Sequence, residues 1–99
     1  MVHYNFEWDP AKAQTNAEKH GVTFERATGV FSDPMALTIF DGEHVRGDKE
    51  DRWITLGQVG GSIYLVVIHT FHDLKEDAVT VRLISARPAT KHEIKQYEG

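Results

Sequence analysis

The chain has 99 residues, of which 40% are hydrophobic and none is cysteine. A chain of this length buries roughly 60–70% of its unfolded surface in one core, so we expect a single domain over residues 1–99. The absence of cysteine excludes disulfides and thiolate metal sites. The longest apolar stretch, Ile63 to Ile68, is far shorter than the ~20 residues of a membrane span, and the first residues lack a secretion signal. We therefore expect a cytoplasmic protein.

The charge is negative and unevenly spread. There are 15 acidic and 11 basic residues, for a formal net charge of -4. All of the excess lies in residues 1–50, because residues 51–99 hold six of each sign. This balance argues against a broad nucleic-acid footprint. Together with the lack of a basic recognition helix, it also disfavours a DNA-binding repressor. Any anion-binding patch must be local.

The first elements are a short extended segment and a helix. Residues 4–8 alternate apolar and polar side chains, as a short strand does. Asp9 is a good N-cap and Pro10 suits the first helical position, where its missing N–H would be unpaired anyway. We expect this helix to end at His20, before Gly21.

A second helix and the first strand of a sheet follow. Thr23 can cap a helix that continues through 26–31 and stops at Asp33-Pro34. Residues 36–40 then read as a strand. The acidic segment 41–51 predicts an exposed loop, which either meets a basic segment of a partner or keeps the chain soluble.

The second half is dominated by strands. Residues 52–57 and 62–71 predict two strands joined through Gly60-Gly61, since both glycines accept positive φ. Residues 80–86 predict a fourth strand, and 91–98 a short polar helix. The order predicts an α+β fold of two N-terminal helices, a four-stranded antiparallel sheet and a C-terminal helix, with the helices gathered on one face.

Two arginines near the end of the last strand are candidates for phosphate binding. Alternation places Arg82 with Ile84 and Ala86 on the less apolar face, and Arg87 follows where the strand gives way to the helix. Two neighbouring guanidiniums can hold phosphate oxygens bidentately. The alternative is that one extends into solvent while the other pairs with Glu93 or an acidic loop residue.

His69 has two interpretations. It ends the most apolar strand, where the pattern favours a core histidine bonded to a neighbour. An imidazole can also carry a proton near neutral pH, as RNA cleavage through the 2′-hydroxyl requires. His72 and Asp73 lie close by, but no third ligand has a fixed spacing, so we expect no metal site and no cofactor.

The first helix carries a cluster of cations. Lys12, Asn16 and Lys19 lie on neighbouring positions of one helical face, with His20 beside them, and these could reach RNA phosphates. Lys19 and His20 also favour the helix dipole, which is the simpler explanation. Arg52 is open between a loop salt bridge and a third cation of a catalytic face.

Beyond single side chains, the chain carries short motifs in a fixed order. They are Phe6-x-Trp8-Asp9-x-x-Lys12-x-x-x-Asn16-x-x-Lys19-His20-Gly21-Val22-x-Phe24-Glu25-x-Ala27, then Asp33-Pro34, Arg52-Trp53, Val67-x-His69-Thr70, and Ile84-Ser85-Ala86-Arg87-x-Ala89-x-x-x-Glu93-x-x-x-Tyr97. Their order and spacing, over nearly the whole chain, resemble the BrnT toxin family. The resemblance implies a RelE-like fold and a metal-independent endoribonuclease, the toxin of a type II toxin–antitoxin pair, which inhibits translation and arrests growth.

The resemblance also implies partners. A BrnA-like antitoxin would neutralise the toxin in a heterotetramer of two chains of each kind. The antitoxin would supply the contact with operator DNA, and the toxin would act on RNA, either free or at the ribosome. The alternative is a non-catalytic module that binds the antitoxin or RNA.

Residue by residue, the resemblance suggests roles for a set of side chains. His69 would take the 2′-hydroxyl proton, while Arg87 and the looser match Arg82 would stabilise charge on the phosphoryl oxygens. Arg52 or Tyr97 would assist the leaving oxygen. The remaining matches, expected to contact RNA, are Lys12, Lys19 and His20.

Overall fold

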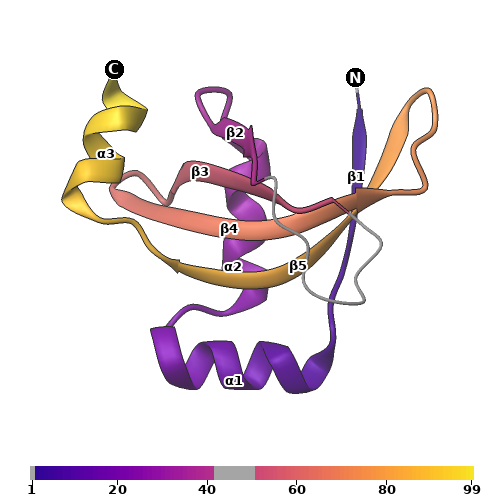
Figure 1. Cartoon of the computed structure of the whole chain (residues 1–99), viewed down its shortest axis with the longest axis horizontal. Coiled ribbons are helices and arrows are strands. Elements are labelled where there is room, and N and C mark those ends of the chain that lie inside the picture. Colours follow the sequence, from indigo (N-terminus) through magenta and orange to yellow (C-terminus); the bar gives the residue numbers. More distant parts are fainter. Residues whose placement is uncertain (1, 42–50) are drawn as a thin grey trace.

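The computed structural model describes residues 2–41 and 51–99 and shows an α+β fold (Figure 1). In chain order the elements are β1 (His3–Glu7), α1 (Pro10–His20), α2 (Phe24–Ala27), the 3₁₀ helix η1 (Thr28–Ser32), β2 (Leu37–Phe40), β3 (Trp53–Val59), β4 (Ile63–His72), β5 (Ala78–Pro88) and α3 (Lys91–Glu98). Within the described ranges no helix is long and apolar enough to cross a membrane. The loop predicted over 41–51 lies outside the described residues, except for its two ends, Asp41 and Asp51.

The sheet is mixed and has five strands in the described chain, in the order β1-β5-β4-β3-β2. The four expected strands pair antiparallel, as predicted. The expectation of a purely four-stranded sheet is corrected by β1, which pairs parallel to β5 with His3 opposite Ala78. Local periodicity shows that a segment is extended, but it gives no sign of a partner about 75 residues further along the chain.

The helix ends follow the sequence signals. Asp9 caps α1 by accepting a hydrogen bond from the Ala11 N–H at 2.9 Å. Gly21 closes the helix in the left-handed conformation, with φ of 70°, and its N–H donates to the Ala17 carbonyl. The predicted helix α3 spans the expected residues, and Thr90 and Glu93 form a capping box at its start.

The second predicted helix is split into two short pieces, α2 and η1. Thr23 caps α2 as expected, through a bond from the Arg26 N–H. The change to 3₁₀ geometry occurs where the chain lies tightly on β3. A Cβ on Gly57 would come within 2.9 Å of the Val30 Cβ, so η1 packs directly against the glycine surface of this strand.

The core lies between α2, η1 and one face of the sheet, with α1 along its β5 side. Its buried residues are Val22, Phe24, Ala27, Val30, Leu65, Val67, Val81, Leu83 and Ala86. In Figure 1, α1 runs alongside β5, whereas α3 lies at the end of the sheet remote from β1. The helices are thus not all gathered on one face: α3 contacts Arg87 on the face opposite the core.

Side chains complete two open stretches of strand edge. β1 covers β5 only up to Arg82, and beyond it the carboxamide of buried Asn16 bonds to both backbone groups of Ala86, at 2.8 and 3.0 Å. β2 covers β3 only as far as Leu56, and beyond it the Gln58 N–H donates to Asp33 Oδ2 at 2.8 Å. Unpaired strand edges invite association with other chains, so these bonds protect the edges and fix α1 on β5.

Candidate functional site

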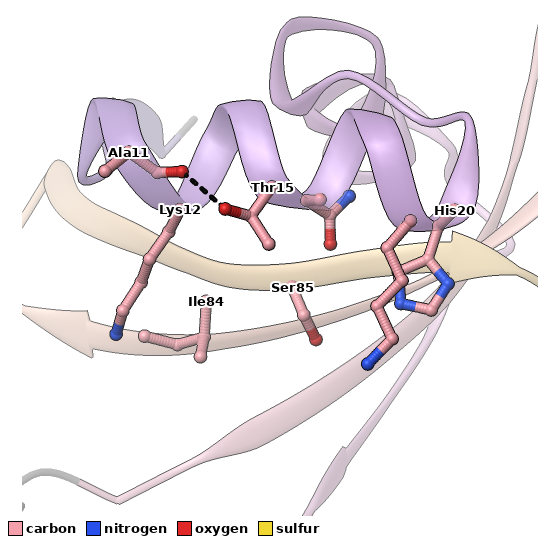
Figure 2. Close-up of a pocket in the computed structure, with 8 residues that line it drawn as sticks. Ala11, Lys12, Thr15, His20, Ile84 and Ser85 are labelled. Atoms are coloured by element: carbon pink, nitrogen blue, oxygen red, sulfur yellow. Dashed lines mark hydrogen bonds between the residues drawn. The ribbon is translucent and has the colours of Figure 1, made fainter.

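A groove of about 310 Å³ lies between α1 and β5 (Figure 2). It is lined by Ala11, Lys12, Thr15, Asn16, Lys19, His20, Ile84 and Ser85. Figure 2 shows Lys12 and His20 at the two ends of the groove, with Ser85 between them on the strand. Thr15 donates to the Ala11 carbonyl at 3.0 Å, so its hydroxyl stays close to the helix backbone. The groove therefore brings together all three side chains that the sequence suggested for RNA contacts.

The floor of the groove is a β-bulge in β5. Ser85 pairs with Ile68 and Leu83 pairs with His69, so Ile84 is an extra residue without a partner on β4. The bulge reverses the alternation expected from the sequence, because Ala86 becomes a core residue and Ser85 leaves the core face. It also moves Arg87 to the face that carries Arg82.

The groove is electrostatically one-sided. Two of its eight lining residues are lysines and one is a histidine, and none of the eight carries a carboxylate. Lys19 and His20 occupy the last turn of α1, where the helix dipole favours positive charge. Both lysine side chains are exposed to solvent. The arrangement suits a ligand with more than one negative group, such as a phosphodiester chain.

Arg87 is held by Glu93 in a bidentate pair. Both Nη···Oε distances are 2.8 Å, and Nη1 also donates to the Pro88 carbonyl. These hydrogen bonds raise the pKa of Arg87 and are the largest cause that lowers the pKa of Glu93, to about 2. The pairing with Glu93 that we considered at the sequence level is therefore present. The pair orients the guanidinium, because two parallel N–H···O bonds fix the plane and direction of the fork against the carboxylate.

Arg82 lies apart from Arg87, so the two do not form the close phosphate-binding pair that was one of the two interpretations of the sequence. Their partners on β4, Thr70 and Val66, are four residues apart, or roughly 13 Å at ~3.3 Å per residue. Arg82 faces its own carboxylate, Glu7, at 3.6 Å.

The acidic neighbour of Arg82 also contacts a histidine. Glu7 Oε1 lies 2.6 Å from His72 Nε2. In the part of the chain that the structure describes, no three acidic or histidine side chains gather in a way that could hold a metal ion. The contact with Glu7 fixes the position of His72 at the end of β4.

His69 is a core residue with no exposed surface. Its ring packs edge-on between Phe31 and Phe71, and Nε2 lies 2.7 Å from the Thr55 hydroxyl. Burial lowers the pKa of His69 to about 4, although the backbone of Thr70 partly opposes this effect. RNA cannot reach this ring in the folded protein. The structure thus matches the core interpretation of His69, and we do not retain it as the base.

The other two proposed residues lie outside the groove. The Tyr97 hydroxyl donates to Asp33 Oδ2 at 2.6 Å, which is the largest cause that raises the pKa of Tyr97 to about 12. The ring packs edge-on against Tyr64, so Tyr97 fastens α3 to the sheet. Arg52 precedes β3, is partly buried, and its carbonyl accepts from the Asp41 N–H.

Two residues of the groove floor, Ile84 and Ser85, were missed as functional residues at the sequence level. They reach the groove only through the bulge, for which strand alternation gives no signal. Asn16 was named at the sequence level with the lysines of its helical face, but its role in holding α1 on β5 was not. A polar amide in a helix interior is a signal for such a tertiary role, because it competes with the helix backbone.

Comparison with known proteins identifies the family of the chain and agrees with its fold. Residues 8–93 match the family described as ribonuclease toxin, BrnT, of type II toxin-antitoxin system. A similar solved structure is the 1.1 Å crystal structure of the Brucella abortus ribonuclease toxin, BrnT, with 25% sequence identity and a TM-score of 0.56. The alignment covers 91% of this chain and 100% of that one. Among curated proteins, none matches the chain.

Proposed function

We propose that this chain, which belongs to the BrnT family of ribonuclease toxins of type II toxin–antitoxin systems, cleaves RNA whose backbone lies in the groove between α1 and β5. The observation that carries the proposal is the groove itself. It places Lys12, Lys19 and His20 beside Ser85, without a carboxylate among the lining residues. Such a surface attracts successive phosphates even though the whole chain is acidic.

The reaction we propose uses the 2′-hydroxyl of RNA as the nucleophile and side chains alone as catalysts. The 2′-oxygen forms a bond to the adjacent phosphorus, the bond to the 5′-oxygen breaks, and a proton passes from the first oxygen to the second. His20 is partly exposed in the groove and replaces His69 as the group that accepts the proton. Lys12 and Lys19 bind the flanking phosphates.

Arg87 supplies charge stabilisation at the end of this path. It follows Ser85 by two residues on the same face of β5. A guanidinium has five N–H groups, and the hydrogen bonds of Arg87 to Glu93 and Pro88 use three of them. The other two can meet a phosphoryl oxygen in an orientation that Glu93 fixes. Arg82 and Arg52 contact more distant phosphates, while Tyr97 holds α3 and with it Glu93.

A comparison of charge-matched variants tests the groove. Lys12→Ala combined with Lys19→Ala should lower kcat/KM for cleavage of a labelled RNA by roughly 100-fold or more. Lys75→Ala combined with Lys91→Ala removes the same charge from exposed positions elsewhere and should have little effect. Equal activity of both variants would refute the groove as the site that binds RNA for cleavage. RNA binding without cleavage by the unmodified chain would favour the non-catalytic module.

A second comparison tests His20. His20→Gln should bind RNA with an affinity close to that of the parent, but its kcat should fall roughly 100-fold. An unchanged kcat would remove His20 from the reaction.

The family description also implies an antitoxin partner. We propose that a BrnA-like antitoxin binds this chain in a complex of two copies of each, and that operator DNA is contacted only by the antitoxin. In this proposal, cleavage of messenger RNA inhibits translation. The reaction then takes place in the cytoplasm, where translation occurs.

A further inference from the structure

The face of the sheet opposite the core carries two rows of apolar side chains in register. Leu37, Leu56 and Val66 form one row across β2, β3 and β4. Ile39, Ile54 and Ile68 form the next row along the same strands. Leu37 and Ile39 are 41% and 61% exposed, so no described element covers the β2 side of this face. An apolar surface of this kind on a small acidic chain usually marks an interaction site.

These rows line a pocket of about 280 Å³ that α3 closes at one end. Arg87, Glu93 and Gln96 complete its wall. The rows are two residues apart, or roughly 6.6 Å, and the three strands span about 10 Å between their outer axes. An α-helix with its side chains is about 10–12 Å wide. One helix laid along the face would therefore cover both rows and insert one or two large side chains into the pocket.

Charge distinguishes between possible occupants. One border of the apolar face carries Arg82 opposite Thr70, and Arg52 directly precedes β3 at the same end of the sheet. Arg87 lies at the other border, beside Val66. Glu7 lies 3.6 Å from Arg82, and Glu93 pairs with Arg87 at 2.8 Å, so each border carries charges of both signs. RNA would have to bury its charge against the exposed aliphatic side chains of these rows, which is unfavourable.

We propose that this face, defined by the two apolar rows and the pocket wall, is the docking site for an amphipathic helix of the antitoxin. The helix presents an apolar stripe to the rows and polar or charged side chains to the ion pairs at the borders. This inference rests on the family membership underlying the proposed function, and it adds the location and chemistry of the contact. It also explains neutralisation, because a helix on this face covers Arg87 next to the RNA groove.

The test is isothermal titration calorimetry of the purified chain with a purified BrnA-like antitoxin. Ile39→Glu places a charge on the exposed β2 side of the face, in the lining of the pocket, and should weaken binding at least ~30-fold, as expected when a charge replaces an apolar contact that binding buries. Leu74→Glu makes the same change at a position that is 73% exposed and lies outside the face. It should bind like the unmodified chain. Circular dichroism melting shows that both variants remain folded.

A growth assay tests the docking site independently of calorimetry. Each variant is expressed with and without the antitoxin, and RNA cleavage is measured on the purified chains. The proposal expects Ile39→Glu to cleave RNA normally and to resist neutralisation, whereas Leu74→Glu is neutralised. Equal binding by both variants overturns the docking site. So does self-association of the unmodified chain that Ile39→Glu abolishes, because the face would then belong to a second copy. Loss of cleavage with normal antitoxin binding refutes only the ribonuclease proposal.

Discussion

At the scale of single residues, the chemistry of this chain depends on which polar and charged side chains are held by a carboxylate partner and which extend into solvent. Glu93 holds Arg87, Asp33 holds Tyr97, and Glu7 faces Arg82. The lysines of the groove are exposed. A phosphate can therefore be bound by lysines that adapt to its position and by an arginine whose direction is already fixed, which is the division of labour expected from their different side chains.

The Arg87–Glu93 pair should make stability depend on pH at low values. The pKa of Glu93 falls from 4.5 to about 2 on folding, so the folded state holds this carboxylate more strongly deprotonated than the unfolded state. The resulting stability is present above pH 4.5 and is lost as the pH falls towards 2. Glu93→Gln should lower the free energy of unfolding at pH 7 by about 1–2 kcal/mol. The melting temperatures of the two proteins should converge between pH 4.5 and 2. A constant difference between the two melting temperatures over this range would show that the pair does not stabilise the fold.

His69 gives a second pH effect, in a different window. Burial lowers its pKa from 6.5 to about 4, so protonation favours the unfolded chain. Its contribution is complete above pH 6.5 and declines as the pH falls to 4, by at most ~1.4 kcal/mol per unit. His69→Gln should flatten the stability curve in this window, as measured by urea unfolding, yet retain RNA cleavage wherever it remains folded. Loss of cleavage by a folded His69→Gln would reinstate the ring as a catalytic group.

At the scale of elements, the site exists because α1 takes the place of a strand beside β5. Asn16 bonds to Ala86 where β1 no longer covers the edge, and it also donates to the Val22 carbonyl. One side chain thus joins the helix, the loop after it and the strand that floors the groove. The bulge at Ile84 then turns Ser85 towards α1.

Removal of the Asn16 amide should therefore affect both stability and activity. Asn16→Ala leaves the two backbone groups of Ala86 buried without partners, which should cost about 2–4 kcal/mol in urea unfolding. Gln14→Ala, on the exposed side of the same helix, loses only a contact with Glu18 and should cost less than ~0.5 kcal/mol. Similar costs for the two variants would show that Asn16 does not hold the edge.

Much of this architecture was predictable, for reasons that differ between elements. The caps at Asp9, Gly21 and Thr90 are local chemistry, so α1 and α3 were correctly bounded. The parallel pairing of β1 and the bulge in β5 depend on tertiary contacts, which periodicity does not contain. The same limit applied to the site. Helical spacing was enough to group Lys12, Lys19 and His20, whereas the face of the sheet on which Arg87 lies depends on the one extra residue of the bulge.

At the scale of the whole molecule, an acidic chain is proposed to bind a polyanion. The dependence of RNA affinity on salt concentration tests how many phosphates the chain contacts. If Lys12, Lys19 and Arg87 are the main phosphate contacts, log K for single-stranded RNA should fall with log salt at a slope of about -2. Affinity would then drop roughly 20-fold between 50 and 200 mM salt. A slope steeper than about -5 would require a basic surface that a chain of charge -4 does not offer.

The groove also predicts how this slope changes when its lysines are removed. Lys12→Ala with Lys19→Ala should reduce it by about 1.4, because each lost contact with single-stranded RNA removes about 0.7. The control pair Lys75→Ala with Lys91→Ala changes the net charge equally and should leave the slope close to -2, as fluorescence anisotropy of a labelled RNA would measure. Equal slopes in the two variants would mean that overall charge governs RNA binding. A difference confined to the groove pair would mean that a local cluster on one helix is sufficient to hold RNA on an acidic protein.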